Sequence, residues 1–480
     1  MTLDADMIPR SDFLLKTIPY FVDVELRGQD KPEDERLHLG LLQTPQCFYD
    51  PDVFQHALYS EKRAPNEQDF FYRTIEPART ATNSVIYGGS NTVLSRRALE
   101  EIGGFFTGSI TEDFATGLLI EAAGYVSLGL EEPLASGQTP HTYREHIQQR
   151  TRWGRGVIVT AKKLRKWMRK NLTPAQKVNY WSSVVYWYSP IKNLIYMLSP
   201  LLFAVFAIPV FVCNWLELAV FWLPMFLLQD LCLRVTSRST ISTKWSGIYE
   251  TSVMPHLLIP VIQETMGISL TGFKVTDKSG GGRTRERDLR AMSPFLVLVL
   301  LSIAGIVRIA LIFEPAQAIS LLILLYWIIR NLYFLVMALF LVDGRDSDGE
   351  PVRVTEAEPV LLECNGTSYE GITTLLTEHN LTVFLDDGGK LPLGATVQVT
   401  AGDGENRPRF RGVVTSVNES RRRSARTHTI EILEHDSGDL EYLQFLYDRI
   451  PTLPQSLHRD FGLLPHLWQN IAHRVARSAK

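Results

Sequence analysis

Long apolar runs in the middle of the chain restrict its possible folds more than any other feature. Residues 194–213 are twenty nearly uninterrupted apolar residues, enough for one helix to cross a bilayer. Residues 294–313 and 318–342 are similar, although the latter contains Arg330 and Asn331. Residues 216–233 are a weaker candidate because they include three polar residues. We therefore expect four membrane-spanning helices, with Arg330 and Asn331 facing protein or a water-filled path.

The distribution of basic residues predicts the orientation of these helices. Residues 213–216 and 314–317 contain no Lys or Arg, whereas the segments before the first span and between the second and third are rich in both. By the positive-inside rule, both polar ends then lie in the cytoplasm of a multi-pass plasma (inner) membrane protein. The net charge of −3 gives no reason to expect nucleic acid as a partner.

Other compositional signals are weak. The four cysteines, at positions 47, 213, 232 and 364, match neither a metal knuckle nor a disulfide framework, so reduced thiols are expected. The first ten residues have neither the basic nor the apolar segment of a signal peptide.

Two acidic clusters precede the apolar region. Asp4 and Asp6 end an expected strand at residues 2–6, where two carboxylates can hold Mg²⁺ by oxygen ligands; a solvated turn is the alternative. Thr111 is expected to be the N-cap of a helix at residues 112–123, with Glu112 and Asp113 in its first turn. Capping accounts for Thr111 and Glu112 and leaves a second role open for Asp113.

A basic amphipathic helix is expected at residues 142–172. It carries Gln149, Arg152 and Trp153 in a Q-x-x-R-W pattern, followed by many Lys and Arg residues. Attraction to anionic lipid explains the basic run at residues 162–170. It explains the Q-x-x-R-W residues less well.

In this order, D-x-D, T-E-D and Q-x-x-R-W followed by membrane spans resemble the signature of processive family 2 glycosyltransferases, such as cellulose, chitin and hyaluronan synthases. The resemblance implies that Asp113, in the motif with Thr111 and Glu112, is the catalytic base. It implies that Asp4 and Asp6 contact the diphosphate through Mg²⁺ or Mn²⁺. Arg152 would neutralise the leaving group beside Gln149, and Trp153 would stack on a sugar ring.

Three further stretches extend this resemblance. Residues 41–54 are similar to the family's Q-T-P-x-x-F-Y-x-P-D-x-F stretch and suggest a stiff loop lining a sugar channel. The Gly88-Gly89 turn, expected between two strands at residues 86–97, resembles one beside the acceptor sugar. A loop resembles the gating loop of bacterial cellulose synthases, which favours that branch of the family. Its motif residues are Phe273, Val275, Thr276 and Lys278.

The C-terminal region is expected to be a small β-barrel. Short alternating strands are predicted near 359–364, 381–386, 395–400, 409–417 and 427–433, followed by helices near 439–449 and 461–478. This position resembles that of a PilZ barrel that binds cyclic di-GMP. Arg345 and Arg353 depart from the R-x-x-x-R spacing, and Gly366 replaces the acid of a motif that keeps Ser368 and Gly371. We therefore expect a barrel with weak or no cyclic di-GMP binding.

The predicted fold is a partial, GT-A-like α/β glycosyltransferase followed by transmembrane α-helices and a C-terminal PilZ-like β-barrel. The predicted regions are the C-terminal part of the transferase domain (1–140), basic interfacial helices (141–193), a membrane region with its gating loop (194–342, loop 271–283), a linker (343–358), the barrel (359–435) and C-terminal helices (436–480).

The resemblance implies an inverting transferase that polymerises UDP-glucose into β-1,4-glucan and moves the chain across the bilayer, with an accessory export subunit as a further partner. Because D-x-D stands at residue 4, the uridine-binding strands and the preceding membrane helices of the family are expected to be missing. The alternatives are another β-glucan or polysaccharide synthase, or a non-catalytic or truncated membrane subunit. Under the first interpretation, the isolated chain is expected to have little activity unless those strands are supplied.

Overall fold

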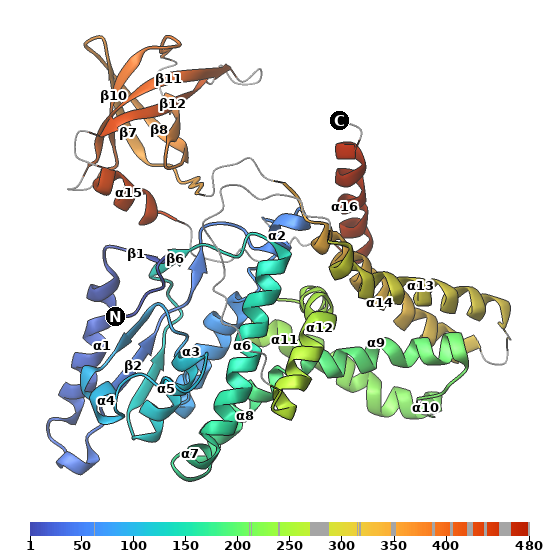
Figure 1. Ribbon diagram of the computed structural model, residues 1–480. Helices are drawn as coiled ribbons and strands as arrows, with labels where there is room; N and C mark the ends of the chain where they lie inside the picture. The colour runs from blue at the N-terminus through green and yellow to red at the C-terminus, as the bar shows by residue number, and fades with distance from the viewer. Residues whose placement is uncertain are drawn as a thin grey trace.

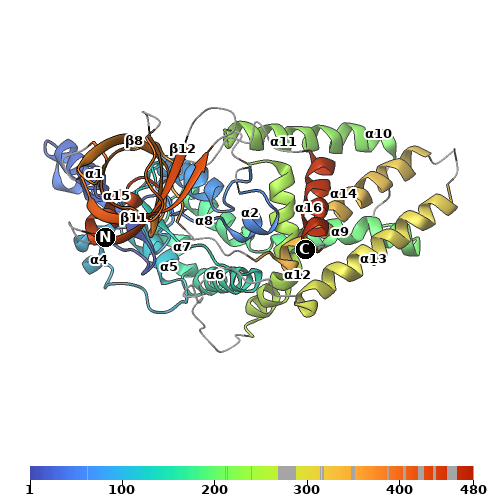
Figure 2. The same ribbon diagram turned by 90° about the horizontal axis from the view of Figure 1, so that it is seen from above.

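The computed structural model describes residues 1–480 except 62, 211, 213, 239–240, 269–287, 314, 316–317, 347–351, 386–388, 404–406, 420–425, 436–438, 451–461 and 479–480. Figure 1 shows an α/β region that contains the N-terminus, long helices extending from it, and a small barrel above it. In Figure 2 the same helices project to one side of the molecule. The three regions follow one another along the chain.

Two three-stranded sheets support the α/β region. In one, β2 (Leu39–Gln43) pairs antiparallel with β4 (Thr92–Leu94) and parallel with β5 (Val126–Gly129). In the other, β6 (Ala135–Gly137) pairs antiparallel with β1 (Ile8–Pro9) and parallel with β3 (Cys47–Phe48). Strand β2 is buried throughout, as its apolar sequence requires. The other elements are α1 (Phe13–Gly28), η1 (Glu33–Glu35), α2 (Val53–Ala57), η2 (Phe71–Ile75), α3 (Glu76–Arg79), η3 (Thr80–Thr82), α4 (Arg96–Glu101) and α5 (Glu112–Ala122).

Two strand predictions in this region are wrong. Instead of a strand at residues 2–6, Thr2 forms a single bridge with Thr92, and the chain turns at Ala5 and Asp6 before β1. No strand precedes the Gly88-Gly89 turn in the described residues 84–89. There the backbone N–H groups of Val85 and Ile86 donate to side chains, at 3.2 and 2.7 Å, instead of to a neighbouring strand. Only β4, after the turn, joins a sheet.

The basic segment forms two helices, α6 (Tyr143–Lys163) and α7 (Arg165–Lys170), separated at Leu164. Thr142 and Glu145 form a capping box that fixes the start of α6. Helix α8 (Pro174–Tyr186) begins in the same way with Thr173 and Gln176. Helix α12 (Thr243–Met266) is continuous although Pro255 and Pro260 lie inside it.

Four helices in the described part of the chain are long and apolar enough to cross a membrane: Ser189–Phe206, Leu218–Thr236, Leu289–Leu311 and Ala318–Asp343. They correspond to α9, to η4 (Leu218–Trp222) with α11 (Leu223–Thr236), to α13 and to α14; the short α10 (Trp215–Glu217) precedes η4. Apolar helices are therefore present at the four predicted positions, with shifted ends. Helix α9 stops at Phe206 because Ala207 adopts a left-handed conformation (φ 58°), and Pro209 follows where a helix cannot continue.

The C-terminal region forms a closed six-stranded barrel, as predicted, in the order β10-β11-β12-β9-β8-β7. Its strands are β7 (Pro359–Cys364), β8 (Thr367–Leu376), β9 (Asn380–Leu385), β10 (Thr396–Ala401), β11 (Arg409–Glu419) and β12 (Arg426–His435). The sequence analysis missed β8. Asn365 (φ 49°) and Gly366 (φ 79°) form the two-residue turn that joins β7 to β8, so Gly366 serves hairpin geometry.

Two helices follow the barrel strands. In α15 (Asp439–Tyr447), the hydroxyl of Tyr442 donates to Thr377 O at 2.7 Å, and its ring packs edge-on against Phe410 inside the barrel. This helix therefore belongs to the barrel core. In contrast, α16 (Leu463–Ser478) lies away from the barrel, beside α14 (Figure 1).

Candidate active site

Asp113 lies in the first turn of α5, where the helix dipole favours an acidic side chain. The backbone N–H of Phe114 donates to Asp113 Oδ1 at 2.7 Å. The other carboxylate oxygen faces the Gly89 turn, where an added Cβ would lie only 2.7 Å from Asp113 Oδ2. Gly89 also has φ 82°, so the turn needs glycine for two reasons. The half-buried Asp113 carboxylate is therefore held between a helix N-terminus and a glycine turn.

The surroundings raise the pKa of Asp113 to about 7. Burial is the largest cause, because it disfavours the charged form. The Phe114 N–H opposes this change, the Glu112 carboxylate adds to it, Arg152 opposes it, and Asp4 adds to it. A carboxyl group with a pKa near 7 can accept a proton from a substrate at physiological pH. The charges of Asp4, Glu112 and Arg152 all act on this carboxylate, so the D-x-D, T-E-D and Q-x-x-R-W motifs meet there.

Thr111 joins α5 to α6 and does not cap α5 through its side chain. It occupies the predicted N-cap position but makes no capping hydrogen bond. Its hydroxyl lies 3.3 Å from that of Thr160, and a Cβ added at Gly156 would come within 2.4 Å of Thr111 Cγ2. The hydroxyl of Ser109 donates to Gly156 O at 3.1 Å. These close contacts fix α6 relative to Asp113. Glu112, in the same motif, has an exposed side chain.

Gln43 positions the glycine turn, a role that the sequence analysis missed. This buried side chain accepts from the backbone N–H of Gly88 at 2.9 Å and from the hydroxyl of Thr92 at 2.7 Å. Gln46 Nε2 donates to Gly88 O at 3.1 Å. The Q-T-P stretch was a usable signal, but it was assigned to a channel lining. The side chains of Gln43 and Gln46 hold in place the turn that faces Asp113.

The Q-x-x-R-W residues lie along α6 in different surroundings. Gln149 is buried, and its Oε1 has no hydrogen-bond partner among the described residues. Arg152 acts electrostatically on Asp113. Trp153 packs against the apolar cluster between α5, α6 and α8, and the guanidinium carbon of Arg150 lies 4.8 Å from its ring centroid. Arg150, which also forms an ion pair with Glu67, was not singled out in the sequence. The Arg150 guanidinium thus makes a cation–π contact with the ring of Trp153.

Asp4 and Asp6 lie on the turn between Thr2 and β1. Ser90 Oγ accepts from the backbone N–H of Asp4 at 2.8 Å, which ties Asp4 to the glycine turn. The backbone N–H of Gln138 donates to Asp6 Oδ2 at 3.0 Å. No group of three or more metal-ligating side chains occurs among the residues that the structure describes. Two carboxylates fit a Mg²⁺ ion that takes its other oxygen ligands from water and phosphate.

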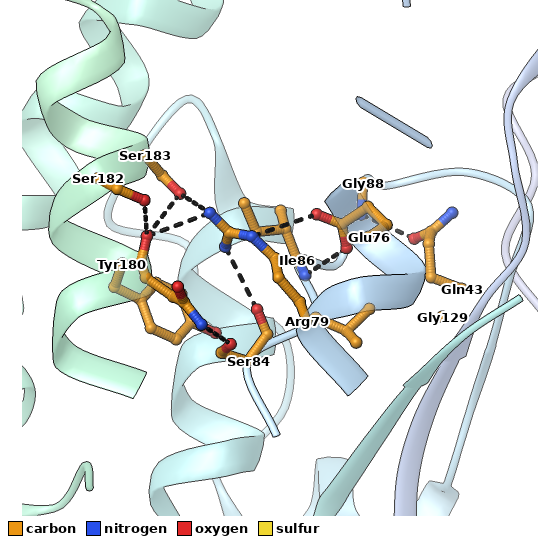
Figure 3. Close-up of polar contacts among 12 residues, drawn as sticks. Gln43, Glu76, Arg79, Ser84, Ile86, Gly88, Gly129, Tyr180, Ser182 and Ser183 are labelled. Carbon is orange, nitrogen blue, oxygen red and sulfur yellow. Dashed lines mark hydrogen bonds and ion pairs between the residues drawn. The ribbon is translucent and has the colours of Figure 1, made fainter. Parts of the chain in front are cut away.

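A buried polar network behind the glycine turn connects the α/β region to α8 (Figure 3). Glu76 Oε2 accepts from Ile86 N at 2.7 Å, and Glu76 Oε1 lies 4.0 Å from Arg79 Nε. Arg79 donates to Ser84 O at 3.3 Å and to Ser183 Oγ of α8 at 2.6 Å. Burial raises the pKa of Glu76 to about 8, although Arg79 and the Ile86 N–H oppose the change. This network supports the site and was not predicted.

The predicted gating-loop residues lie outside the described residues. Phe273, Val275, Thr276 and Lys278 all fall within 269–287. Their relation to Asp113 therefore remains a prediction.

The fold and the site define a class of protein. It has an α/β domain in which a carboxylate with a raised pKa lies in the first turn of a helix, and this domain is joined to candidate membrane helices. Residues 1–229 match the family model described as "Glycosyl transferase family group 2". The chain therefore contains a domain of this glycosyltransferase family. The match includes every predicted site residue from Asp4 to Trp153 and ends before the gating loop.

Similarity to individual curated proteins is more specific than the family match. The chain is 28% identical over 402 residues to the cellulose synthase catalytic subunit (UDP-forming) of Pseudomonas fluorescens (strain SBW25), which covers 82% of this chain and 52% of the relative. It is 32% identical over 323 residues to the cellulose synthase 1 catalytic subunit (UDP-forming) of Komagataeibacter xylinus, with 67% and 42% covered. The chain thus spans about half the length of these relatives.

One solved structure shows only a partial likeness. The Bacillus subtilis inhibitor of motility (MotI/DgrA) matches 22% of this chain and 52% of its own, at 16% identity. The TM-score of 0.20 is too low for this match to bear on the fold.

Proposed function

We propose that this chain contributes the base-bearing part of a membrane-bound, processive glycosyltransferase that uses UDP-glucose to extend a β-1,4-glucan. The observation that carries the proposal is the Asp113 carboxyl group. Its pKa is about 7, and Asp4 and Arg152 act on it electrostatically. Both relatives described above carry names that include cellulose synthase and UDP-forming, which supports this substrate and product.

In the proposed reaction, Asp113 accepts the proton of a hydroxyl at the non-reducing end of the glucan. The hydroxyl oxygen then bonds to the anomeric carbon of glucose, while the bond from that carbon to the diphosphate oxygen breaks. UDP departs with the electron pair of the broken bond. One such displacement inverts the configuration at the anomeric carbon. The half-buried position of Asp113 suits this role, because a base must lie within hydrogen-bond reach of the proton that it accepts.

The remaining site residues would bind and neutralise the donor. Asp4 and Asp6 would hold a divalent cation, Mg²⁺ or Mn²⁺, which supplies positive charge to the diphosphate when bound. Arg152 would meet the charge that develops on the leaving UDP. We assign Trp153 to a sugar ring and Gln149 to the same subsite, because Gln149 has a buried oxygen without a partner among the described residues.

We also propose that the four apolar helices span the inner membrane and conduct the glucan. The sequence between 269 and 287 would supply the gating loop, with Phe273, Val275, Thr276 and Lys278 closing over the nucleotide. The Lys and Arg distribution supports a cytoplasmic location for both polar ends. An accessory export subunit would receive the polymer. The domain limits in this proposal are those predicted from the sequence.

Two other functions remain candidates. Another polysaccharide synthase of the same family would use the same base with a different donor or linkage. A non-catalytic membrane subunit would keep the fold without turnover. The bracing of the Gly89 turn against Asp113 favours a catalytic chain, since a chain without turnover has no need for this close approach.

Product analysis tests the proposal. Native membranes incubated with labelled UDP-glucose are expected to yield polymer that a β-1,4-specific glucanase degrades, and excess EDTA is expected to abolish its synthesis. Polymer resistant to that enzyme would indicate another synthase. Full synthesis in EDTA would rule out the metal role of Asp4 and Asp6.

A further inference from the structure

In the C-terminal helix α16, the placement of polar and apolar side chains is the reverse of that in a helix on a water-exposed protein surface. Its outward face is entirely apolar, and its large side chains there are Leu464 (75% exposed), Trp468 (71% exposed) and Val475 (63% exposed). At spacings of four and seven residues they share one side of the helix. The other exposed residues on this side, Pro465, Ala472 and Ala476, are also apolar.

The inward face of α16 is polar, and its first half binds buried groups. His466 is fully buried, with Nε2 3.1 Å from Ser60 Oγ and Nδ1 3.0 Å from the hydroxyl of Tyr333. Asn470, also fully buried, donates to Leu58 O at 3.1 Å. Each contact gives a buried polar group a hydrogen bond that water would otherwise supply.

The second half of α16 continues the same pattern. The ring of His473 stacks on that of Tyr59 with centroids 4.5 Å apart. Arg474 donates to Asp343 Oδ2 at 2.7 Å and to Phe340 O at 2.8 Å. Arg477 forms an ion pair with Asp346. The polar side chains of α16 thus contact the protein, whereas Leu464, Trp468 and Val475 point away from it and Leu467 packs against the core that includes α14.

The position of α16 indicates what covers the apolar face. From His466 to Arg474 and Arg477, its contacts move in one direction, from Tyr333 in the second half of α14 to Asp343 at its end and Asp346 just after it. Helix α14 is one of the four candidate membrane spans. The outward face of α16 is therefore continuous with a surface that is apolar enough to meet lipid, at the level where α14 ends. In Figure 1, α16 rises from the part of α14 nearest the α/β region.

We propose that α16 is an interfacial helix whose outward face, centred on Leu464, Trp468 and Val475, lies in the lipid at the membrane surface. A tryptophan at the centre of such a face is typical of the boundary between headgroups and acyl chains. The lipid would hold α16 against α14 and against the chain at residues 57–60, directly after α2. This inference requires only that α14 spans the membrane, and it does not depend on the sugar or on Asp113.

This mode of binding differs from electrostatic attraction. Arg474 and Arg477 are both engaged by aspartates of this chain, so they are committed to protein contacts. The basic run of α6 and α7, in contrast, belongs to a segment expected to attract anionic headgroups. We therefore expect the membrane contact of α16 to persist in high salt, because burial of apolar area is not screened.

A matched pair of leucines tests the proposal. Leu464 on α16 is 75% exposed, and Leu440 on α15 of the barrel is 78% exposed. The full chain is reconstituted into phosphatidylethanolamine–phosphatidylglycerol vesicles, and amide hydrogen exchange is measured for wild type, Leu464→Glu and Leu440→Glu. If lipid covers Leu464, the new charge must leave it, so exchange in α16 should rise at least about tenfold. Leu440→Glu should leave exchange in α15 within about twofold. Equal, small effects of both substitutions would overturn the proposal.

A second measurement identifies the occupant of the face. A nitroxide is attached through Trp468→Cys in a chain whose own cysteines are replaced by serine, in the same vesicles, with Thr374→Cys on the barrel as a water-exposed control. Lipid coverage predicts that oxygen relaxes the label at position 468 more effectively than a water-soluble nickel reagent does, with the reverse order at 374. A label at 468 that is accessible to nickel, or protected from both reagents as under a protein partner, would contradict the proposal.

Discussion

At the scale of single residues, the protein environment of Asp113 sets the conditions under which it can act as a base. Burial raises its pKa to about 7, while the Phe114 N–H and Arg152 keep the pKa from rising further. If both hydrogen-bond donor and cation were absent, the carboxyl group would hold its proton at physiological pH. If the site were more open, it would be a weaker base. The contacts around Asp113 thus balance ionisation against basicity.

This balance predicts a pH dependence. Only the ionised carboxylate accepts a proton, so turnover should rise as the pH passes through about 7 and then level off. Because the pKa in the folded chain exceeds the ordinary value of 3.8, ionisation costs stability. The cost should be absent below pH 3.8, grow as the pH rises to about 7, and stay constant above that. The test is the initial rate of UDP release at saturating donor. A rate that does not change between about pH 5.5 and about pH 8.5 would exclude this base.

Alanine substitutions at two glycines distinguish the effect of the Gly89 turn on turnover from its effect on stability. Gly89 and Gly103 have similar positive φ angles of 82° and 85°. An added Cβ at Gly89 meets Asp113 Oδ2 at 2.7 Å, whereas one at Gly103 meets nothing within 4 Å. Both alanine substitutions should cost roughly 1–2 kcal/mol of stability. Only Gly89→Ala should also lower turnover, by at least about tenfold, because it displaces the base. Equal turnover in the two variants would argue against a role for this turn.

The sequence analysis predicted some of the site residues but not the residues that hold them in position. Asp113 could be predicted because the T-E-D residues 111–113 are contiguous and resemble a motif of the family. Gln43 and Arg150 could not, since their partners Gly88 and Glu67 lie far away in the sequence. Thr111 was assigned the correct position but the wrong contact, because its nearness to Thr160 depends on how α5 packs on α6. Contacts between distant segments are what a local pattern leaves out.

At the scale of elements, the network around Arg79 connects α3 to α8, the helix before the first candidate span. Arg79→Leu should destabilise the chain by about 3–5 kcal/mol, because it removes the cation beside the buried Glu76 carboxyl and leaves the Ser84 and Ser183 acceptors without their donor. Arg96→Leu, at an exposed arginine on α4, should change stability by less than about 0.5 kcal/mol. Thermal unfolding in detergent measures both. Similar melting temperatures for the two variants would show that Arg79 does not hold α8 in place.

The barrel yields a prediction about regulation. Gly366 belongs to the β7–β8 turn and offers no side-chain acceptor, and Arg345 donates to Glu61 Oε1 at 2.6 Å and to His56 O at 3.2 Å. A cyclic dinucleotide would have to displace these contacts to use Arg345 for its phosphates. Calorimetric titration of the full chain with cyclic di-GMP should therefore give a dissociation constant weaker than about 100 μM. A low-micromolar or tighter value would show that the barrel keeps the binding site.

Helices and strands could be predicted where their sequence pattern is long. One barrel strand was missed where only a short turn separates it from the strand before it. The four apolar runs are long enough to reveal helices, yet their ends depend on single features such as the left-handed Ala207. Five barrel strands were found from alternation, whereas β8 was lost because its first residues were assigned to a ligand motif. The Asn365-Gly366 pair is itself a hairpin signal and could have revealed β8. Similarly, α12 stayed continuous despite two prolines because it is packed between α6, α9 and α14.

At the scale of the whole molecule, the base, the interfacial helices and the candidate spans form one connected structure. Asp113 is held by α5, α5 packs on α6 through Thr111, and α6 packs on α12. Helix α12 in turn contacts α9 and α14. Under the proposed function, this continuity keeps the reacting end of the glucan at a fixed distance from the membrane path, which a processive enzyme requires.

The central claim is that this connected structure transfers glucose with Asp113 as the base. The most direct test replaces Asp113 by Asn in the native organism, so that every other component is present, and measures β-1,4-glucanase-sensitive polymer and UDP release in isolated membranes. Asparagine has nearly the same shape but cannot accept the proton, so synthesis should fall by about 10²–10⁴-fold while UDP binding is retained. Glu100→Gln, at an exposed carboxylate on α4, is the control and should match wild type. Polymer synthesis by the Asp113→Asn membranes at the wild-type rate would contradict the account.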